Sequence, residues 1–475
     1  MKYSLIFLVV ILFSVSKFGQ VPVATPQLYS LETLASVKQI QKTSLKNDYS
    51  YDQLRYLSYN IGARLSGSPQ AARAVEYVAA EMKKLGLEVS LQKCMVPHWV
   101  RGDERGDVVE FPGMAAGSTQ KLILTTLGGS VATPADGLTA EIVVVSSFDE
   151  LNALGKEKIA GKIVVFNYKF DREMQRSGFG GGAYGPAVQY RFGGAMAAAR
   201  LGAVAVLVRS AGGSQNRLAH TGTMGYADGV TKIPGAAISF EDAEMLAWLA
   251  KSGQTRVRLV LTPQTLPDVE SYNVIADLKG TERPNEIVIV SGHLDSWDLG
   301  QGALDDGAGV AISMAVPAII KQLGLKPRRT IRFIAWMNEE NGGRGSAAYA
   351  EAEKNNFANH FAAIEADLGA SHPVGFLFAG KSEALPFLAP ISALLQSQGA
   401  GMSQVQAGVG ADVAPLTRAG VPSFAPWFDQ RTYFNYHHTA ADTFDKVDKS
   451  ELQESTSLVT ALAYALANLE QPLPR

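Results

Sequence analysis

The chain of 475 residues has an ordinary globular composition, with 47% hydrophobic and 19% charged residues, so it can bury a sizeable core. Its formal net charge of -2 and the lack of long like-charge runs exclude an electrostatic footprint for nucleic acid or an anionic membrane surface. The length indicates two or three domains.

The amino-terminal segment is typical of a secretory signal peptide. Met1 and Lys2 precede an apolar run from residue 4 to residue 16, which matches the basic and apolar regions of such a signal. The run is short for a membrane span of about 20 residues, and an uncleaved anchor is the alternative. We therefore expect a signal peptide over residues 1–20, no stable membrane insertion after its removal, and a secreted or periplasmic protein. Residues 21–46 follow as a helical leader or propeptide.

The only cysteine, Cys94, excludes an intrachain disulfide. Export without disulfides is compatible with a bacterial periplasm or the extracellular space. Cys94 lies in a strand-like segment, residues 88–96, where a buried structural thiol is favoured over a nucleophile.

Two parts of the chain have the alternating pattern of an α/β sheet domain. Amphipathic helices over residues 51–60 and 70–85 precede the strand that contains Cys94. From Asn273 onward, strands and helices alternate, as in an α/β sheet. The expected strands are residues 273–276, 286–291, 330–336 and 362–366, and the expected helices are residues 307–322, 346–354, 384–397 and 451–469.

The region between these parts, residues 102–268, alternates short apolar runs with glycine-rich turns. One helix is expected over residues 190–201, and the stretch Gly178–Tyr184 is expected to be the most flexible. The pattern indicates a compact β-rich domain inserted into a larger one. The larger domain then consists of residues 47–101 and 269–475.

Histidines and carboxylates follow the predicted strands at their carboxyl ends, where an open α/β sheet gathers ligand-binding groups. The residues that follow three of these strands are His293 with Asp295, Glu339 with Glu340, and Asp367. Asp305 and Asp306 stand at the start of the helix expected over residues 307–322, and His437 and His438 lie in a later segment. Several carboxylates in one cleft repel each other unless cations neutralise them. Three carboxylates with two neutral histidines balance most of the charge of two divalent ions, and the remaining positive charge acidifies bound water. The pattern therefore predicts a metal site.

Each of these residues also has a simpler structural explanation. A lone histidine after a strand is usually solvated, and Asp305 and Asp306 could cap the following helix and complement its dipole. Glu339 and Glu340 could begin a solvated loop, and Asp367 could belong to a turn. The metal interpretation depends on all of them reaching the same edge of one sheet.

The order of these residues resembles the motif set of the co-catalytic dizinc exopeptidases, a family that includes bacterial leucyl aminopeptidases and glutamate carboxypeptidases. The matching segments are His293–Asp295, Gly302–Gly309, Glu339–Ser346, Asp367 and His438–Thr443. Further similarity in the insert extends the resemblance over most of the mature chain. It implies a mixed-sheet α/β/α zinc-exopeptidase domain with an inserted lid of the protease-associated type.

The resemblance also implies a role for each metal-site residue. Asp305 corresponds to the carboxylate that bridges two zinc ions. His293 and Asp367 complete one ion's site, and Glu340 and His438 complete the other. Cobalt or manganese could also bind such mixed nitrogen and oxygen ligands.

Other residues receive supporting roles from the same resemblance. Glu339 corresponds to the general base that takes a proton from the water between the metals, and Asp295 to a partner that holds His293 in its liganding tautomer. His438 is favoured over His437 as the ligand because the family pattern has histidine directly before serine or threonine. In the lid, His220 could contact the substrate or be an ordinary loop histidine.

The function implied is that of a secreted zinc-dependent exopeptidase with a peptide substrate, of carboxypeptidase or dipeptidase type, and a homodimer. An aminopeptidase on the same scaffold is the first alternative. A metal-free binding protein is the second, although the five ligand positions and Glu339 are all present.

Overall fold

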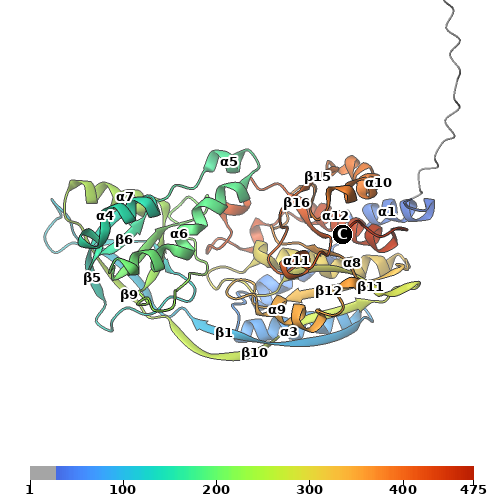
Figure 1. Ribbon diagram of the computed structural model, residues 1–475, viewed down its shortest axis with the longest axis horizontal. Helices are drawn as coiled ribbons and strands as arrows, with labels where there is room; N and C mark the ends of the chain where they lie inside the picture. The colour runs from blue at the N-terminus through green and yellow to red at the C-terminus, as the bar shows by residue number, and fades with distance from the viewer. Residues whose placement is uncertain (1–27) are drawn as a thin grey trace, which may run out of the picture.

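The computed structural model describes residues 28–475, which form two lobes joined by a pair of long antiparallel strands (Figure 1). These strands are β1 (Glu88–Val100) and β10 (Gln264–Leu278). The expected signal peptide over residues 1–20 lies outside the described residues. The described part of the expected leader contains α1 (Leu31–Ser44), which packs against α12 (Lys449–Asn468).

The larger lobe contains an eight-stranded mixed sheet whose central strands are parallel. In order across the sheet, the strands are β1, β10, β12 (Arg329–Trp336), β11 (Arg283–His293), β13 (His360–Glu365), β16 (Ser423–Phe428), β14 (Pro373–Ala379) and β15 (Met402–Val405). Because β12, β11, β13 and β16 run in the same direction, their carboxyl ends share one edge of the sheet.

Helices cover both faces of this sheet, which confirms the expected α/β/α fold. Val288 and Val290 of β11 belong to the apolar cluster on one face, whereas Ile287 and Ile289 belong to the cluster on the other. Alternate side chains of a strand point to opposite faces, so an unbroken run of β-branched residues marks a strand buried on both sides. The helices of the first face are α1, α2 (Tyr49–Tyr56), α3 (Pro69–Lys84), α8 (Ala308–Gln322), α10 (Leu385–Leu395) and α12, and those of the second are α9 (Arg344–Glu353) and α11 (Ala414–Arg418).

Among the described residues, one helical segment, Ala303–Gln322, is long and apolar enough to cross a membrane by length and composition. All of its apolar window is buried inside the larger lobe. This segment contains α8, whose side chains pack against β11 and α12, as expected of a core helix.

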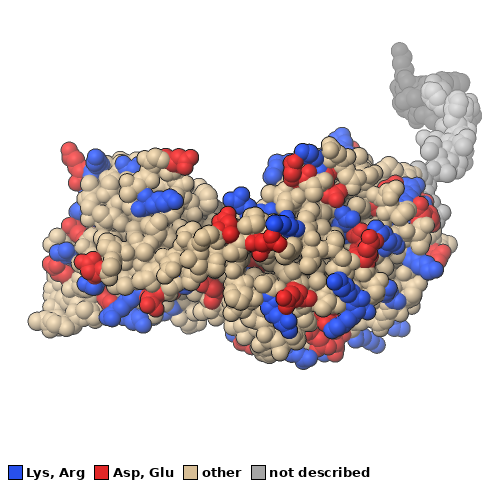
Figure 2. All heavy atoms as spheres, turned by 90° about the horizontal axis from the view of Figure 1, so that it is seen from below, with Lys and Arg blue, Asp and Glu red and all other residues tan. Residues whose placement is uncertain are grey.

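The smaller lobe contains a second eight-stranded sheet, formed by residues 104–261. In order across the sheet, its strands are β3 (Gln120–Lys121), β2 (Glu104–Glu110), β9 (Arg256–Leu261), β5 (Leu138–Val145), β6 (Ile163–Phe166), β7 (Ala205–Arg209), β8 (Gly235–Ile238) and β4 (Leu124–Thr126). Its helices are α4 (Phe148–Ile159), α5 (Arg172–Arg176), α6 (Gly180–Arg200) and α7 (Phe240–Ser252). The space-filling view shows that the lobes meet at a narrower waist and that charges of both signs are mixed over the face in view (Figure 2).

Helix α6 begins ten residues earlier than the sequence predicts, at Gly180 instead of residue 190. The glycine-rich stretch that was expected to be flexible forms its first turns. A Cβ added to Gly180 would lie 2.7 Å from the ring of Phe434 and 2.8 Å from the carbonyl oxygen of Gln430. Contact with the larger lobe thus overrides the low helix propensity of glycine.

Candidate metal centre

The structure brings the predicted metal-site residues together at the carboxyl edge of the larger sheet. His293 is the last residue of β11, Glu340 follows β12, and Asp367 follows β13. The loop after β16 supplies His438, and the turn before α8 supplies Asp305. All but Asp367 are buried.

Two donor sets meet at Asp305. The Nε2 atom of His293 lies 3.1 Å from Asp305 Oδ1 and 3.4 Å from Asp367 Oδ1. The Nε2 atom of His438 lies 3.1 Å from Asp305 Oδ2 and 2.9 Å from Glu340 Oε2. Each oxygen of Asp305 therefore contacts a different histidine.

Asp306 is as close to the centre as Asp305 but has structural partners. Its Oδ2 accepts a hydrogen bond from the backbone N–H of His293, at 2.9 Å, and its Oδ1 accepts one from Gly309, at 3.0 Å. It therefore ties the end of β11 to the first turn of α8. One of its oxygens also lies close enough to His293 and Asp367 to share an ion with them.

Asp295 supports the centre differently from the expectation. The Nδ1 atom of His293 lies 3.0 Å from the backbone oxygen of Asp295 but 3.9 Å from its carboxylate. That carboxylate instead accepts hydrogen bonds from Ser66 Oγ at 2.9 Å, from Asn338 N at 2.7 Å and from Glu339 N at 3.1 Å. Asp295 thus orients the imidazole through its backbone and the glutamate loop through its side chain.

Two further polar residues hold the backbone around Asp305. The carboxylate of Asp442 accepts hydrogen bonds from the N–H groups of Ala303, Leu304 and Asp305. Arg64, which is fully buried, donates to the carbonyl oxygens of Gly62, Leu294, Gln301 and Gly302. Arg64 is not among the predicted site residues, because the Ser-Gly-Ser-Pro segment that follows it, residues 66–69, indicates only a turn.

Burial and repulsion between carboxylates raise the pKa values of Glu339 and Glu340. Burial, reinforced by Asp305, raises the pKa of Glu340 to about 7 although His438 opposes the shift. Burial, together with the charges of Asp367 and Glu340, raises the pKa of Glu339 well above its ordinary value. Positive charge among these groups would favour their ionised forms.

The residues present fit zinc. Asp305 Oδ2 and Glu340 Oε1 are buried and have no hydrogen-bond partner within the described chain. A buried carboxylate oxygen without a partner is costly, and a bound cation removes that cost. Histidine nitrogens and carboxylate oxygens are ligands that zinc binds in proteins.

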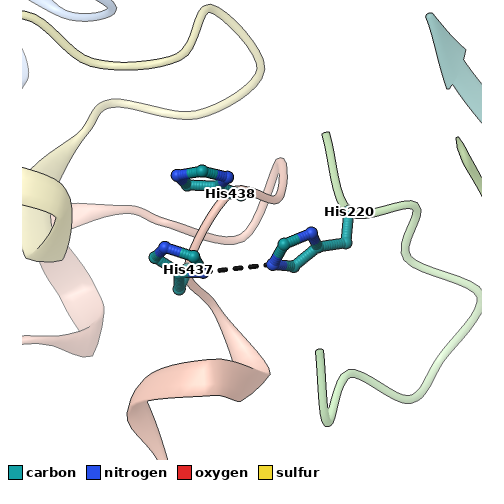
Figure 3. Close-up of side chains that lie close together, drawn as sticks. All are labelled: His220, His437 and His438. Carbon is teal, nitrogen blue, oxygen red and sulfur yellow. Dashed lines mark hydrogen bonds between the residues drawn. The ribbon is translucent and has the colours of Figure 1, made fainter. Parts of the chain in front are cut away.

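The smaller lobe reaches into this centre through His220 and Thr221. Thr221 donates its N–H to the backbone oxygen of His438 at 2.8 Å, and its own carbonyl lies 3.2 Å from His438 Nδ1. The imidazole of His220 lies 3.0 Å, Nε2 to Nδ1, from that of His437, which stacks on His438 (Figure 3). Burial lowers the pKa values of His220 and His437 well below the ordinary value, and neighbouring histidines lower them further.

Comparison with known proteins agrees with this architecture. Residues 273–463 match the profile of Peptidase family M28. The chain is 40% identical over 429 residues to carboxypeptidase Q from Bos taurus, and the aligned region covers 90% of this chain and 87% of that protein. It is 38% identical over 429 residues to carboxypeptidase Q from Homo sapiens, with the same coverage of 90% and 87%.

Solved structures extend the comparison to the fold. The crystal structure of a Peptidase M28 precursor from Shewanella amazonensis superposes with a TM-score of 0.88 at 35% identity, covering 94% of this chain and 99% of that one. BSAP, a zinc aminopeptidase from Bacillus subtilis, superposes with a TM-score of 0.64 at 22% identity, covering 90% of this chain and 98% of that one, and shows a similar fold.

The fold, the donor sets and these relatives define a zinc-dependent metallo-exopeptidase. The chain belongs to peptidase family M28, the co-catalytic zinc exopeptidases that include carboxypeptidase Q. The family predicted from the sequence is thereby confirmed.

Proposed function

We propose that this exopeptidase hydrolyses dipeptides or short peptides at a free carboxyl end, using two zinc ions and a glutamate general base. The observation that carries the two-ion proposal is Asp305, whose two oxygens lie 3.1 Å from histidines of separate donor sets. This arrangement suits a carboxylate that bridges two ions. The relatives named carboxypeptidase Q support the carboxypeptidase type.

The chain's residues divide between the two ions. His293 and Asp367 would hold one ion and Glu340 and His438 the other, with Asp305 shared between them. When bound, the zinc ions polarise the scissile carbonyl and lower the pKa of the attacking water. Mixed imidazole and carboxylate ligation is compatible with that chemistry.

Glu339 is the proposed general base. Its neighbour Glu340 contacts His438, whereas no hydrogen bond to the Glu339 carboxylate is found within residues 28–475. Burial raises its pKa, and the positive charge of bound zinc would oppose that rise and keep the carboxylate ionised, so that it can accept a proton. Glu339 accepts a proton from water as the water oxygen bonds to the carbonyl carbon. It then donates that proton to the leaving nitrogen as the C–N bond breaks.

Replacement of Glu339 by glutamine tests this role. The Glu339→Gln variant should bind zinc normally and lose about 10²–10⁴-fold in kcat, because an amide cannot accept the proton. Zinc content, melting temperature and dipeptide hydrolysis are measured together. Glu351→Gln, at an exposed position of α9, is the matched control and should behave like the natural protein. Normal turnover by Glu339→Gln would mean that the general base lies elsewhere.

A cavity between the lobes favours a substrate with a free carboxyl end. It has a volume of about 230 Å³ and is lined by Arg172, Arg176 and Arg431, with no carboxylate among its lining residues. Arg431 pairs with Asp429, and Arg176 with Glu173. Arg172 has no carboxylate partner within the described part of the chain, and Tyr436, which lines the cavity, directly precedes His437 in the sequence.

An aminopeptidase is the second candidate. The chain is 26% identical over 334 residues to a probable leucine aminopeptidase 2 from Aspergillus fumigatus, and the match covers 70% of this chain and 57% of that protein. Hydrolysis of N-acetylated and C-amidated dipeptides separates the two. A carboxypeptidase retains activity on the acetylated substrate and loses it on the amide. The reverse pattern would establish an aminopeptidase.

The organisation of the whole protein adds three proposals. Residues 102–268 form a lid domain inserted between residues 47–101 and 269–475, and Thr221 and His220 support its docking over the centre. Residues 1–20 are removed on export, so the mature protein is secreted or periplasmic. The mature protein is a homodimer. Amino-terminal sequencing and light scattering of the purified protein test export and assembly.

A further inference from the structure

His220 and His437 form a hydrogen-bonded pair that joins the two lobes beside the metal centre. His220 Nε2 lies 3.0 Å from His437 Nδ1, and both side chains are buried. Figure 3 shows the His220 ring approaching from the smaller lobe while the His437 ring lies parallel to that of His438. The rings of Tyr184, Tyr433 and Phe434 surround His437 at centroid distances of 5.1–5.3 Å.

The direction of this hydrogen bond decides which His437 nitrogen carries a proton. A neutral imidazole has one N–H donor and one acceptor. If His437 Nδ1 donated, His220 Nδ1 would carry a buried proton, and His220 Nδ1 has no partner within the described chain. If His220 Nε2 donates instead, His220 Nδ1 carries no proton, so the atom left without a partner is an acceptor and not an N–H donor. Buried unpaired N–H groups are the rarer case in proteins, so His220 is the donor.

His437 then carries its proton on Nε2, which points to the centre. That atom lies 3.3 Å from Asp305 Oδ2. The contact lacks hydrogen-bond geometry, since Asp305 Oδ2 has no hydrogen-bond partner in the described chain. The Nε2–H group is therefore free to donate to another oxygen placed between the donor sets.

His438 already has the arrangement of a metal ligand. Its Nε2 faces Glu340 and Asp305, and its Nδ1 lies 3.2 Å from the carbonyl oxygen of Thr221. A ligating histidine commonly donates its second N–H to such a carbonyl. Arg191 also lies 3.2 Å from this Nδ1, but arginine only donates, and its Nη1 contacts Tyr184 and Thr221 as acceptors. His437 is thus not needed as a ligand.

We propose that His437 is a catalytic residue whose Nε2–H donates a hydrogen bond to the oxygen of the scissile carbonyl, and that His220 of the smaller lobe is the positioning residue that fixes this tautomer. The inference rests on the proposed function, because it assigns a donor to the same reaction. A preorganised donor stabilises the negative charge that develops on the carbonyl oxygen in the transition state. No proton leaves His437 in this role.

Paired substitutions at position 220 test the positioning role in the zinc-loaded protein. His220→Phe keeps the ring shape without a donor, whereas His220→Gln places an amide N–H near the position of Nε2. We expect His220→Phe and His437→Phe to lower kcat by about 10²–10³-fold with little change in KM or zinc content, and His220→Gln to recover most of the rate. His372→Gln, at a half-exposed histidine, is the control.

The tautomer is measured independently of activity by ¹⁵N NMR of histidine-labelled protein, which has seven histidines. We expect His437 to carry its proton on Nε2 in the natural protein and to lose this preference in His220→Phe. A proton on Nδ1 of His437, loss of zinc in His437→Phe, or equal rates in His220→Phe and His220→Gln would overturn the proposal. If the natural protein binds zinc but cleaves no peptide, the proposed function fails, and the NMR result still decides whether His220 sets the tautomer.

Discussion

Adjacent acidic residues in this centre differ in their hydrogen-bond partners, and these partners separate ligands from supports. Asp306 accepts two backbone N–H groups, whereas Asp305 Oδ2 has no hydrogen-bond partner in the described chain. Glu340 likewise keeps one buried oxygen without a partner. Buried oxygens without protein donors are those that a cation can use.

Asp295 provides a test of how the glutamate loop is held. The Asp295→Asn variant replaces one acceptor oxygen with an NH₂ group, which is a donor. This group would face another donor, either the Ser66 hydroxyl or the N–H groups of Asn338 and Glu339, and the hydrogen bonds on that side would be lost. We expect zinc affinity to fall by about 10–100-fold, measured by competition with a chelator. Ser66→Ala, which removes one of these hydrogen bonds, should have the smaller effect. Unchanged affinity in Asp295→Asn would show that the loop does not depend on this carboxylate.

From the sequence, the candidate metal ligands could be predicted together, but of the residues that support them only Asp295 could be named. His293, Glu340 and Asp367 could be grouped because each follows a strand of one sheet. Arg64 and Thr221 could not be found in this way, because they reach the centre through the packing of distant segments. The ambiguity between His437 and His438 arises from the same cause, since the contacts that distinguish them come from the smaller lobe.

At the scale of elements, the strands richest in β-branched residues were predictable, whereas β14, β15 and β16 were not. Strand β16 contains Pro426, which normally argues against a strand in the interior of a sheet. In the structure, β13 pairs only with Ser423 and Phe424, so Pro426 lies beyond that ladder. The proline therefore costs no hydrogen bond to β13.

The ion pair between β10 and β12 gives a pH-dependent prediction. Asp277 lies opposite Arg332, with contacts of 2.8 and 2.9 Å. Burial alone would raise the pKa of Asp277, but Arg332 lowers it below its ordinary value. The pair therefore stabilises the fold fully above the ordinary pKa of about 3.9 and loses its effect as the pH falls through the lowered pKa.

Asp277→Asn should lower the free energy of unfolding by about 3 kcal/mol at neutral pH, because it removes the closer charge partner of Arg332 and leaves only Glu353, at 3.7 Å. The difference in the free energy of unfolding between this variant and the natural protein should shrink as the pH falls below about 4. Urea unfolding of both proteins between pH 3 and pH 7 measures it. A difference that stays constant or grows in acid would contradict this account of the pair.

At the scale of the whole molecule, the two lobes interlock beside the centre. Arg101 forms an ion pair with Asp298 and also donates a hydrogen bond to Thr125 Oγ1 of the smaller lobe, at 2.7 Å. The ring of Trp297 lies against Gly128 of the smaller lobe. Trp297 also lines the small cavity formed by Asp305, Glu340 and His438. The position of the smaller lobe and the shape of the centre are therefore linked.

Gly128→Ala tests this link, because its Cβ would collide with the ring of Trp297. We expect the variant to keep its fold and lose on the order of 10–100-fold in kcat/KM, since small displacements of positioning groups are costly. Gly185→Ala in α6, where an added Cβ meets nothing, should leave the rate unchanged. If both variants hydrolysed peptides at the natural rate, the lobe contact would not matter for catalysis.

Anomalous diffraction at the zinc edge from crystals of the zinc-loaded protein decides whether the centre binds two ions that share Asp305. We expect two zinc peaks about 3.5–4 Å apart, one beside His293 and Asp367 and the other beside Glu340 and His438, with Asp305 bound to both. A single peak, or a pair of peaks that does not share Asp305, would contradict this expectation.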